Sequence, residues 1–218
     1  MQALDLLSSI LNSQSTATFS FGVLFTLIVI LAASGRVFYI LTQQWTTHRP
    51  IEALREWARD RDFDLSLPPK VELPTVVKGW ASLDPRVDIL LKRGPVMLVR
   101  LTTKARPALP RPVWNLLIRE LTTAQNPAGL RPASATHSFL DLFSLNGFPS
   151  LLPPERFVAF AVDSKDAKAM AASTARGLMP ADIGLLVHGP YVTLDFSARP
   201  FDAIEFDRML AIMEQVAR

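Results

Sequence analysis

The sequence predicts an α+β fold. In this fold an N-terminal transmembrane helix precedes one soluble domain with a mixed or antiparallel sheet, two hairpins and a C-terminal amphipathic helix. Three observations predict it. Residues 19–41 form an apolar segment long enough to cross a bilayer. Two later segments pair β-rich runs around a glycine, and residues 199–218 repeat apolar side chains at helical spacing.

The apolar segment over residues 19–41 is the predicted transmembrane helix. It carries no charge from Phe19 to Gly35. The hydrocarbon core of a bilayer is about 30 Å thick, and a helix needs about 20 mostly apolar residues to cross it. The predicted parts of the chain are a short N-terminal segment at 1–18, the transmembrane helix at 19–41, a linker at 42–49 and a soluble domain at 50–218.

Basic residues flank the predicted helix on one side only. Residues 1–18 contain no Lys or Arg, whereas arginines recur between residues 36 and 61. Basic residues near a transmembrane helix tend to stay in the cytoplasm. The sequence therefore predicts a single-pass protein of the cell (inner) membrane, with the N-terminus outside and the C-terminal domain in the cytoplasm.

Composition excludes several kinds of chemistry. The 218 residues include no cysteine, so thiolate catalysis, disulfides and cysteine-ligated metal sites are excluded. The net charge of +3 is too small to indicate nucleic-acid binding by itself. We expect no nucleic-acid partner, and the sequence leaves the oligomeric state open.

The first half of the soluble domain mixes helical and extended patterns. The expected elements are a helix over 50–61, a strand over 63–67, a hairpin of 87–91 and 96–102 that turns at Gly94, and a strand or short helix over 113–121. Residues 74–83 fit either one helical turn or a loop packed on the core. Residues 122–155 are rich in proline and are predicted to form a long irregular loop.

The last quarter has clearer periodicity. We expect a strand over 156–163, a helix capped by Asp163 or Ser164 that ends at Gly177, and a second hairpin of 183–187 and 191–196 that turns at His188 and Gly189. A C-terminal helix follows, with Phe206, Met209, Leu210, Met213 and Val216 on one face. A rival architecture is a small curved barrel closed by this helix, as in pleckstrin-homology-like domains.

Catalytic motifs are sparse. The three histidines, His48, His137 and His188, are too far apart in sequence for local metal-ligand spacing. Neither a phosphate-binding glycine loop nor a G-x-S-x-G motif occurs. We therefore expect no catalytic residues, no metal and no cofactor. The alternative is a membrane-tethered hydrolase-like enzyme with a site in the 122–155 loop that uses His137.

Basic residues dominate the segment from Arg86 to Arg119, where Asp88 is the only acid. Anionic headgroups attract basic residues near a membrane surface by about 1 kcal/mol each. We therefore predict a surface that binds anionic lipid headgroups or an acidic partner such as a membrane protein. Its residues are Lys92, Arg93, Arg100, Lys104, Arg106 and Arg111. The alternative is a solvated basic edge that discourages sheet-to-sheet pairing.

Three motifs carry a resemblance. They are ALREWARDRDFDL after the apolar segment, FAVDSKDAKAMAA, and DFSARPFDAIEF near the C-terminus. With one N-terminal apolar segment, they resemble the small single-pass bacterial membrane proteins of unknown function. The resemblance implies no activity and no site residues. The predicted function is a membrane-anchored, non-enzymatic binding or scaffolding module.

Overall fold

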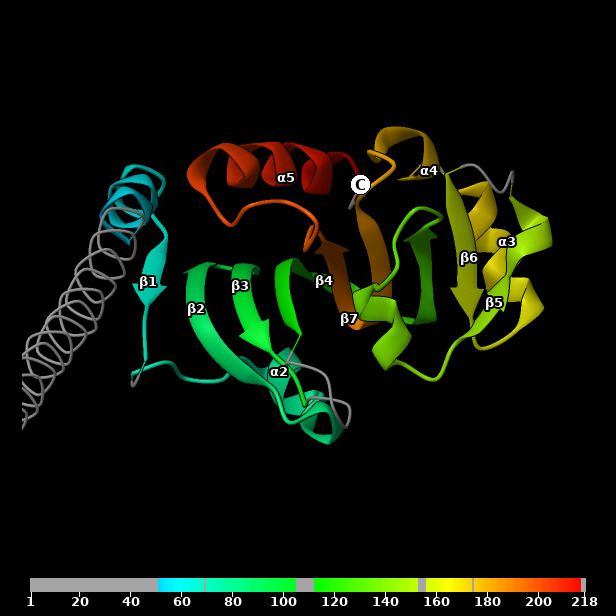
Figure 1. Cartoon of the computed structure of the whole chain (residues 1–218), viewed down its shortest axis with the longest axis horizontal. Helices are drawn as coiled ribbons and strands as arrows, with labels where there is room; N and C mark the ends of the chain where they lie inside the picture. Colours follow the sequence, from blue (N-terminus) through cyan, green and yellow to red (C-terminus); the bar gives the residue numbers. More distant parts are fainter. Residues whose placement is uncertain (1–50, 69, 105–111, 153–155, 174, 217–218) are drawn as a thin grey trace, which may run out of the picture. The chain divides into compact units, whose positions relative to one another are not determined.

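The structure is a computed structural model that describes residues 51–218, apart from 69, 105–111, 153–155, 174 and 217–218 (Figure 1). Residues 53–218 form one compact unit. The predicted parts at 1–18, 19–41 and 42–49 lie outside the described residues.

One antiparallel sheet organises the described part of the chain (Figure 1). Its strands are β1 (Asp64–Ser66), β2 (Arg86–Arg93), β3 (Val96–Thr102), β4 (Val113–Pro132), β5 (Asn146–Phe148), β6 (Phe157–Ala161) and β7 (Gly184–Asp195). The strand order is β1-β2-β3-β4-β6-β5, and β7 pairs with β4. Every strand pair is antiparallel. The expectation of a mixed or antiparallel sheet is therefore corrected to a fully antiparallel one for the described strands.

Short helices surround the sheet. They are a helix over residues 51–60, α2 (Thr75–Gly79), α3 (Ser164–Ala172), α4 (Ala175–Leu178), α5 (Ala203–Val216) and the 3-10 turns η1 (Ala81–Leu83), η2 (Phe139–Leu142) and η3 (Pro149–Leu151). Asp163 caps α3 by accepting hydrogen bonds from two backbone amides, as predicted, but the helix ends at Ala172 rather than at Gly177.

Both faces of the sheet are buried. Successive strand residues point to opposite faces, and the core divides accordingly. Leu98 and Leu117 belong to a cluster that includes Met209 of α5 and Ala167 of α3. Their sequence neighbours in β3 and β4 belong to a second cluster, which includes Val77 of α2 and both buried residues of η2. We call these the α5 face and the α2 face.

The helix over residues 51–60 is joined to α5 through Asp207. The indole Nε1 of Trp57 donates a hydrogen bond to Asp207 Oδ1 at 3.1 Å, and Arg61 Nη2 donates to Oδ2 at 2.7 Å. The Trp57 ring also meets the Phe206 ring edge-on, at 5.0 Å between centroids. The predicted amphipathic face of α5 is thus used against both the sheet and the first described helix.

Two sequence predictions about β structure are wrong, for one reason. Residues 184–195 form a single strand, β7, rather than a hairpin at His188 and Gly189, and β4 continues to Pro132 through part of the predicted irregular loop. β4 and β7 pair along their length, with register shifts on either side of Gln125. Because Gly189 lies opposite Gln125 within the ladder, its positive φ of 58° belongs to an irregularity in the strand and not to a turn.

The first predicted hairpin is confirmed. β2 and β3 pair from Arg86 with Thr102 to Arg93 with Val96, and Gly94 adopts φ 54° in the turn. Glycine takes this left-handed conformation without the steric cost that a Cβ atom imposes.

The prediction of a single-pass transmembrane protein finds no support in the described part of the chain, and its helix at 19–41 lies outside that part. Among the described residues, no helix combines the length and apolar character needed to cross a membrane. The 14 residues of α5 span only about 21 Å at the helical rise, against a hydrocarbon core of about 30 Å.

Candidate binding pocket between a hairpin turn and the C-terminal helix

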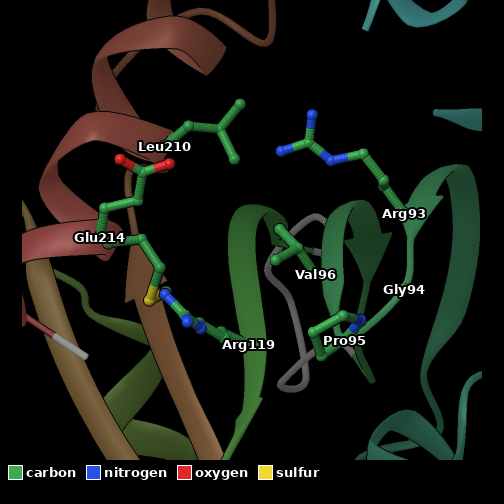
Figure 2. Close-up of a pocket in the computed structure, with 8 residues that line it drawn as sticks. Arg93, Gly94, Pro95, Val96, Arg119, Leu210 and Glu214 are labelled. Atoms are coloured by element: carbon green, nitrogen blue, oxygen red, sulfur yellow. The ribbon is translucent and has the colours of Figure 1, made fainter. Parts of the chain in front are cut away.

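A pocket of about 490 Å³ lies where the turn between β2 and β3 faces α5. Its lining residues are Arg93, Gly94, Pro95, Val96, Arg119, Leu210, Met213 and Glu214. Figure 2 shows Leu210 and Glu214 on one side of the pocket, Arg93 and Pro95 on the other, and Val96 and Arg119 on the strands between them. Sites for small molecules typically measure about 300–1,000 Å³, so the pocket has the size of a binding site.

Strand register places two arginines on the same face of the sheet. Arg93 of β2 pairs with Val96 of β3, and Val96 pairs with Arg119 of β4. The three residues thus form one row across neighbouring strands, on the α5 face. Neighbouring strands lie about 4.8 Å apart, so the backbones of the two arginines are separated by roughly 10 Å. Both arginines line the pocket, so a ligand that lies between them can meet either guanidinium.

The helix contributes an apolar surface and one carboxylate. Leu210, Met213 and Glu214 are spaced by three and four residues, which places them on one face of α5. Met213 is buried, Leu210 is half-buried and Glu214 is exposed. The pocket therefore has an apolar wall beside a charged rim.

Neither arginine in the pocket forms an ion pair with another described residue. Arg93 is held in another way. Its Nη1 donates a hydrogen bond to the Arg61 carbonyl at 3.1 Å, and its guanidinium lies 4.6 Å from the centre of the Phe63 ring. These contacts hold the side chain in place and do not neutralise its charge. Two guanidinium groups without a carboxylate partner are suited to binding an anion.

Of the four predicted binding residues that the structure describes, one, Arg93, lines this pocket. Lys92 precedes Arg93 in β2, so its side chain lies on the opposite, α2 face. Arg100 shares the α5 face but lies four residues beyond Val96 along β3. Lys104 is exposed after β3, where its amide donates to the Leu83 carbonyl at 2.8 Å.

The remaining two predicted residues, Arg106 and Arg111, lie outside the described residues. A role in binding anionic headgroups or an acidic partner stays a prediction for all six. Sequence reasoning did not select Arg119 or the α5 residues. The basic run did include Arg119, and helical periodicity did mark Leu210 and Met213, but only the strand register shows that these residues meet.

His137, on which the hydrolase alternative rests, does not line this pocket. Its side chain is exposed, and no hydrogen bond or ring contact joins it to another described residue. The adjacent Ser138 is buried and serves as the N-cap of η2. Its Oγ donates to Asp195 Oδ2 at 3.4 Å and accepts from the Leu140 amide at 3.3 Å.

Asp195 binds backbone and hydroxyl groups from two segments. Its Oδ2 accepts from the Phe139 amide at 2.7 Å, and its Oδ1 accepts from the Ser197 amide at 3.1 Å and hydroxyl at 2.5 Å. Burial raises the pKa of the Asp195 carboxyl, and these hydrogen bonds oppose that shift. The arrangement joins the end of β7 to η2, and Ser138 and Asp195 are accounted for by this structural role.

A cluster of charges lies at the start of α5. Arg199 donates to both carboxylate oxygens of Asp182 at 2.7 Å and to Glu205 Oε2 at 2.9 Å. Hydrogen bonding from Arg199 is the main cause that lowers the pKa of Asp182 and of Glu205. No group of three or more His, Asp or Glu side chains in the described part of the chain could hold a metal ion.

Comparison with known proteins gives a likeness of fold. The crystal structure of the mycobacterial trehalose monomycolate transport factor A, TtfA, aligns with a TM-score of 0.50 and 12% sequence identity. The alignment covers 75% of this chain and 90% of that one. No family model matches the sequence, and no curated protein matches it. At this identity the likeness concerns the fold alone.

Proposed function

We propose that the domain is a non-enzymatic binding module and that the pocket between the β2–β3 turn and α5 is its ligand site. The observation that carries this proposal is the composition of the pocket. Two arginines without a described ion-pair partner flank an apolar wall, in a volume typical of small-molecule sites. Rigid strands and a packed helix hold these groups, as a preformed binding site requires.

The lining residues favour binding over catalysis. They comprise two arginines, one glutamate, a glycine and four apolar residues. Glu214 is the one lining side chain that could serve as a general base or nucleophile, and the set supplies no serine, threonine, lysine or histidine to act with it. The structure of similar fold is that of a transport factor, and a transport-associated binding role for this chain is in line with that likeness.

A pocket-filling substitution tests the proposal. Full-length wild-type chain and Val96→Trp would be incubated with a small-molecule extract of the source cells, and retained compounds would be identified by native mass spectrometry. The wild type should retain a compound that is recovered chemically unchanged, and Val96→Trp should not retain it, because the indole occupies the pocket.

The matched control is Val113→Trp, which places the same ring on an exposed valine outside the pocket. This variant should retain the compound as the wild type does. Equal retention by Val96→Trp would contradict the location of the site, and recovery of a chemically altered compound would contradict a non-enzymatic role.

A further inference from the structure

We propose that the ligand of the pocket is an amphiphilic monoanion, in which one carboxylate or phosphodiester group meets Arg93 and Arg119 and an apolar chain lies along α5. This inference rests on the proposed function and specifies the chemistry of its ligand.

The anionic group follows from the two arginines. A guanidinium presents five N–H donors in a planar fork that matches the oxygens of a carboxylate or phosphate. In Arg93 one terminal nitrogen is bonded to the Arg61 carbonyl, so the remaining donors are available to a ligand. Figure 2 shows the Arg93 guanidinium pointing across the pocket toward α5, and Arg119 lies on β4, two strands away in the sheet. Both groups thus border the same space.

A single negative charge follows from Glu214. The charged side chains that line the pocket are Arg93, Arg119 and Glu214, which together carry one net positive charge. A dianion would meet the carboxylate of Glu214 as well as the guanidiniums, and like charges at close range disfavour binding. A carboxylate or phosphodiester leaves the pocket neutral.

The apolar chain follows from the wall of the pocket. Val96 lies between the two arginines in the strand row, and Leu210 and Met213 face it from α5. Methionine has three rotatable bonds and a polarisable sulfur, so it adapts to flexible aliphatic chains. Burying each CH₂ group of a ligand contributes about 0.8 kcal/mol, and an apolar chain would therefore supply most of the affinity.

The size of the site favours a small molecule over a protein partner. Stable protein interfaces bury about 800 Å² on each partner and involve about 20–30 residues a side. The pocket is lined by eight residues. One short aliphatic chain with its head group occupies a site of this extent.

Isothermal titration calorimetry on the full-length chain tests the inference. The probes share one chain length: octanoate, octyl methyl phosphate, neutral octyl glucoside and cationic octyltrimethylammonium. We expect the two anions to bind and the neutral and cationic probes to bind at least about tenfold more weakly, the loss expected for one charge-assisted interaction. Comparison of the two anions then distinguishes a fatty-acid-like from a phospholipid-like source.

Four variants separate charge from fold. Arg93→Gln and Arg119→Gln should each weaken octanoate binding about tenfold or more, and Arg93→Lys should fall between Arg93→Gln and the wild type. Glu214→Gln should keep or tighten binding. Lys92→Gln is the control, because it removes the same charge from the neighbouring residue on the opposite face. It should leave the affinity within about twofold of the wild type.

The inference would be overturned by octyl glucoside binding as tightly as octanoate, by the absence of anion binding, or by Lys92→Gln weakening binding as much as Arg93→Gln. The proposed function is tested apart from this. If Val96→Trp still abolishes retention of a neutral or cationic compound from the extract, the pocket remains the ligand site and only the ligand class is wrong.

Discussion

Gly129 lies in β4 where no larger residue fits. A Cβ atom at this position would collide with the backbone oxygen of Leu185 in the neighbouring strand β7 and with the Leu140 side chain of η2. Backbone cannot yield as a side chain end can, so the strands must move apart. We predict that Gly129→Ala lowers the free energy of unfolding by about 2–3 kcal/mol, as overpacked core positions do.

Chemical denaturation measures this change. Gly79→Ala is the matched control, because a Cβ atom there meets no other atom within 4 Å. Alanine favours helix over glycine by up to about 1 kcal/mol, so this variant should equal or exceed the wild type in stability. A Gly129→Ala protein as stable as Gly79→Ala would contradict the described packing of β4 against β7.

Arg199 makes stability depend on acidic pH. Its hydrogen bonds lower the pKa of Asp182 and Glu205 below their ordinary values of 3.8 and 4.5. The unfolded chain therefore takes up protons at these groups before the folded chain does, and the stabilisation is lost as the pH falls from about 5 through the lowered pKa values. We predict that Arg199→Met is less stable than the wild type at pH 7 and loses less stability between pH 5 and 3.

Urea denaturation at a series of pH values measures both effects. Asp195 has the opposite tendency, because its pKa is raised, but it is present in both proteins and cancels in the comparison. Arg59→Met is the control, since the ion pair of Arg59 with Asp60 is exposed, and its pH profile should follow the wild type. Parallel profiles for Arg199→Met and the wild type would show that Arg199 does not set these pKa values.

At the scale of elements, the turn between β2 and β3 fixes the edge of the pocket. Gly94 has φ 54°. For a residue with a Cβ atom, this left-handed conformation costs about 1–2 kcal/mol of conformational energy. We predict that Gly94→Ala is less stable than the wild type by about 1 kcal/mol and binds octanoate more weakly, because Arg93 and Val96 flank the turn.

Gly94→Asn provides the comparison, because asparagine tolerates the left-handed conformation better than alanine does. It should retain more stability and more binding than Gly94→Ala, with stability measured by denaturation and affinity by calorimetry. The proposed geometry would be refuted if Gly94→Ala matched the wild type in both measurements.

Residue patterns along the sequence predicted some helices and strands correctly and others wrongly. The β2–β3 hairpin was predictable because two β-rich runs flank a glycine, and Asp163 was predictable as a cap. β4 was not, because residues 121–127 are mostly polar and exposed and include a proline. They remain extended because β7 pairs with β4 on either side of this stretch. That pairing depends on β7, which begins some 60 residues further along the chain. A pattern among neighbouring residues does not predict so distant a partner.

At the scale of the whole domain, the candidate pocket is assembled from three distant segments. The β2–β3 turn, Arg119 and the end of α5 meet only because the strand order places β3 beside β4 and because α5 covers that face. Sequence reasoning predicted a basic surface from a run of neighbours along the chain. In the folded domain the strand period divides that run between two faces, and Arg93 and Arg119 line the same pocket from strands β2 and β4.

Hydrogen–deuterium exchange of the full-length chain, with and without saturating octanoate, tests the central claim most directly. If the pocket is the ligand site, protection should rise together in the segments around residues 93–96 and 210–214, which are remote in sequence. It should stay unchanged around residues 137–142. Protection that rises around 137–142, or that leaves both pocket segments unchanged while octanoate is bound, would contradict the account.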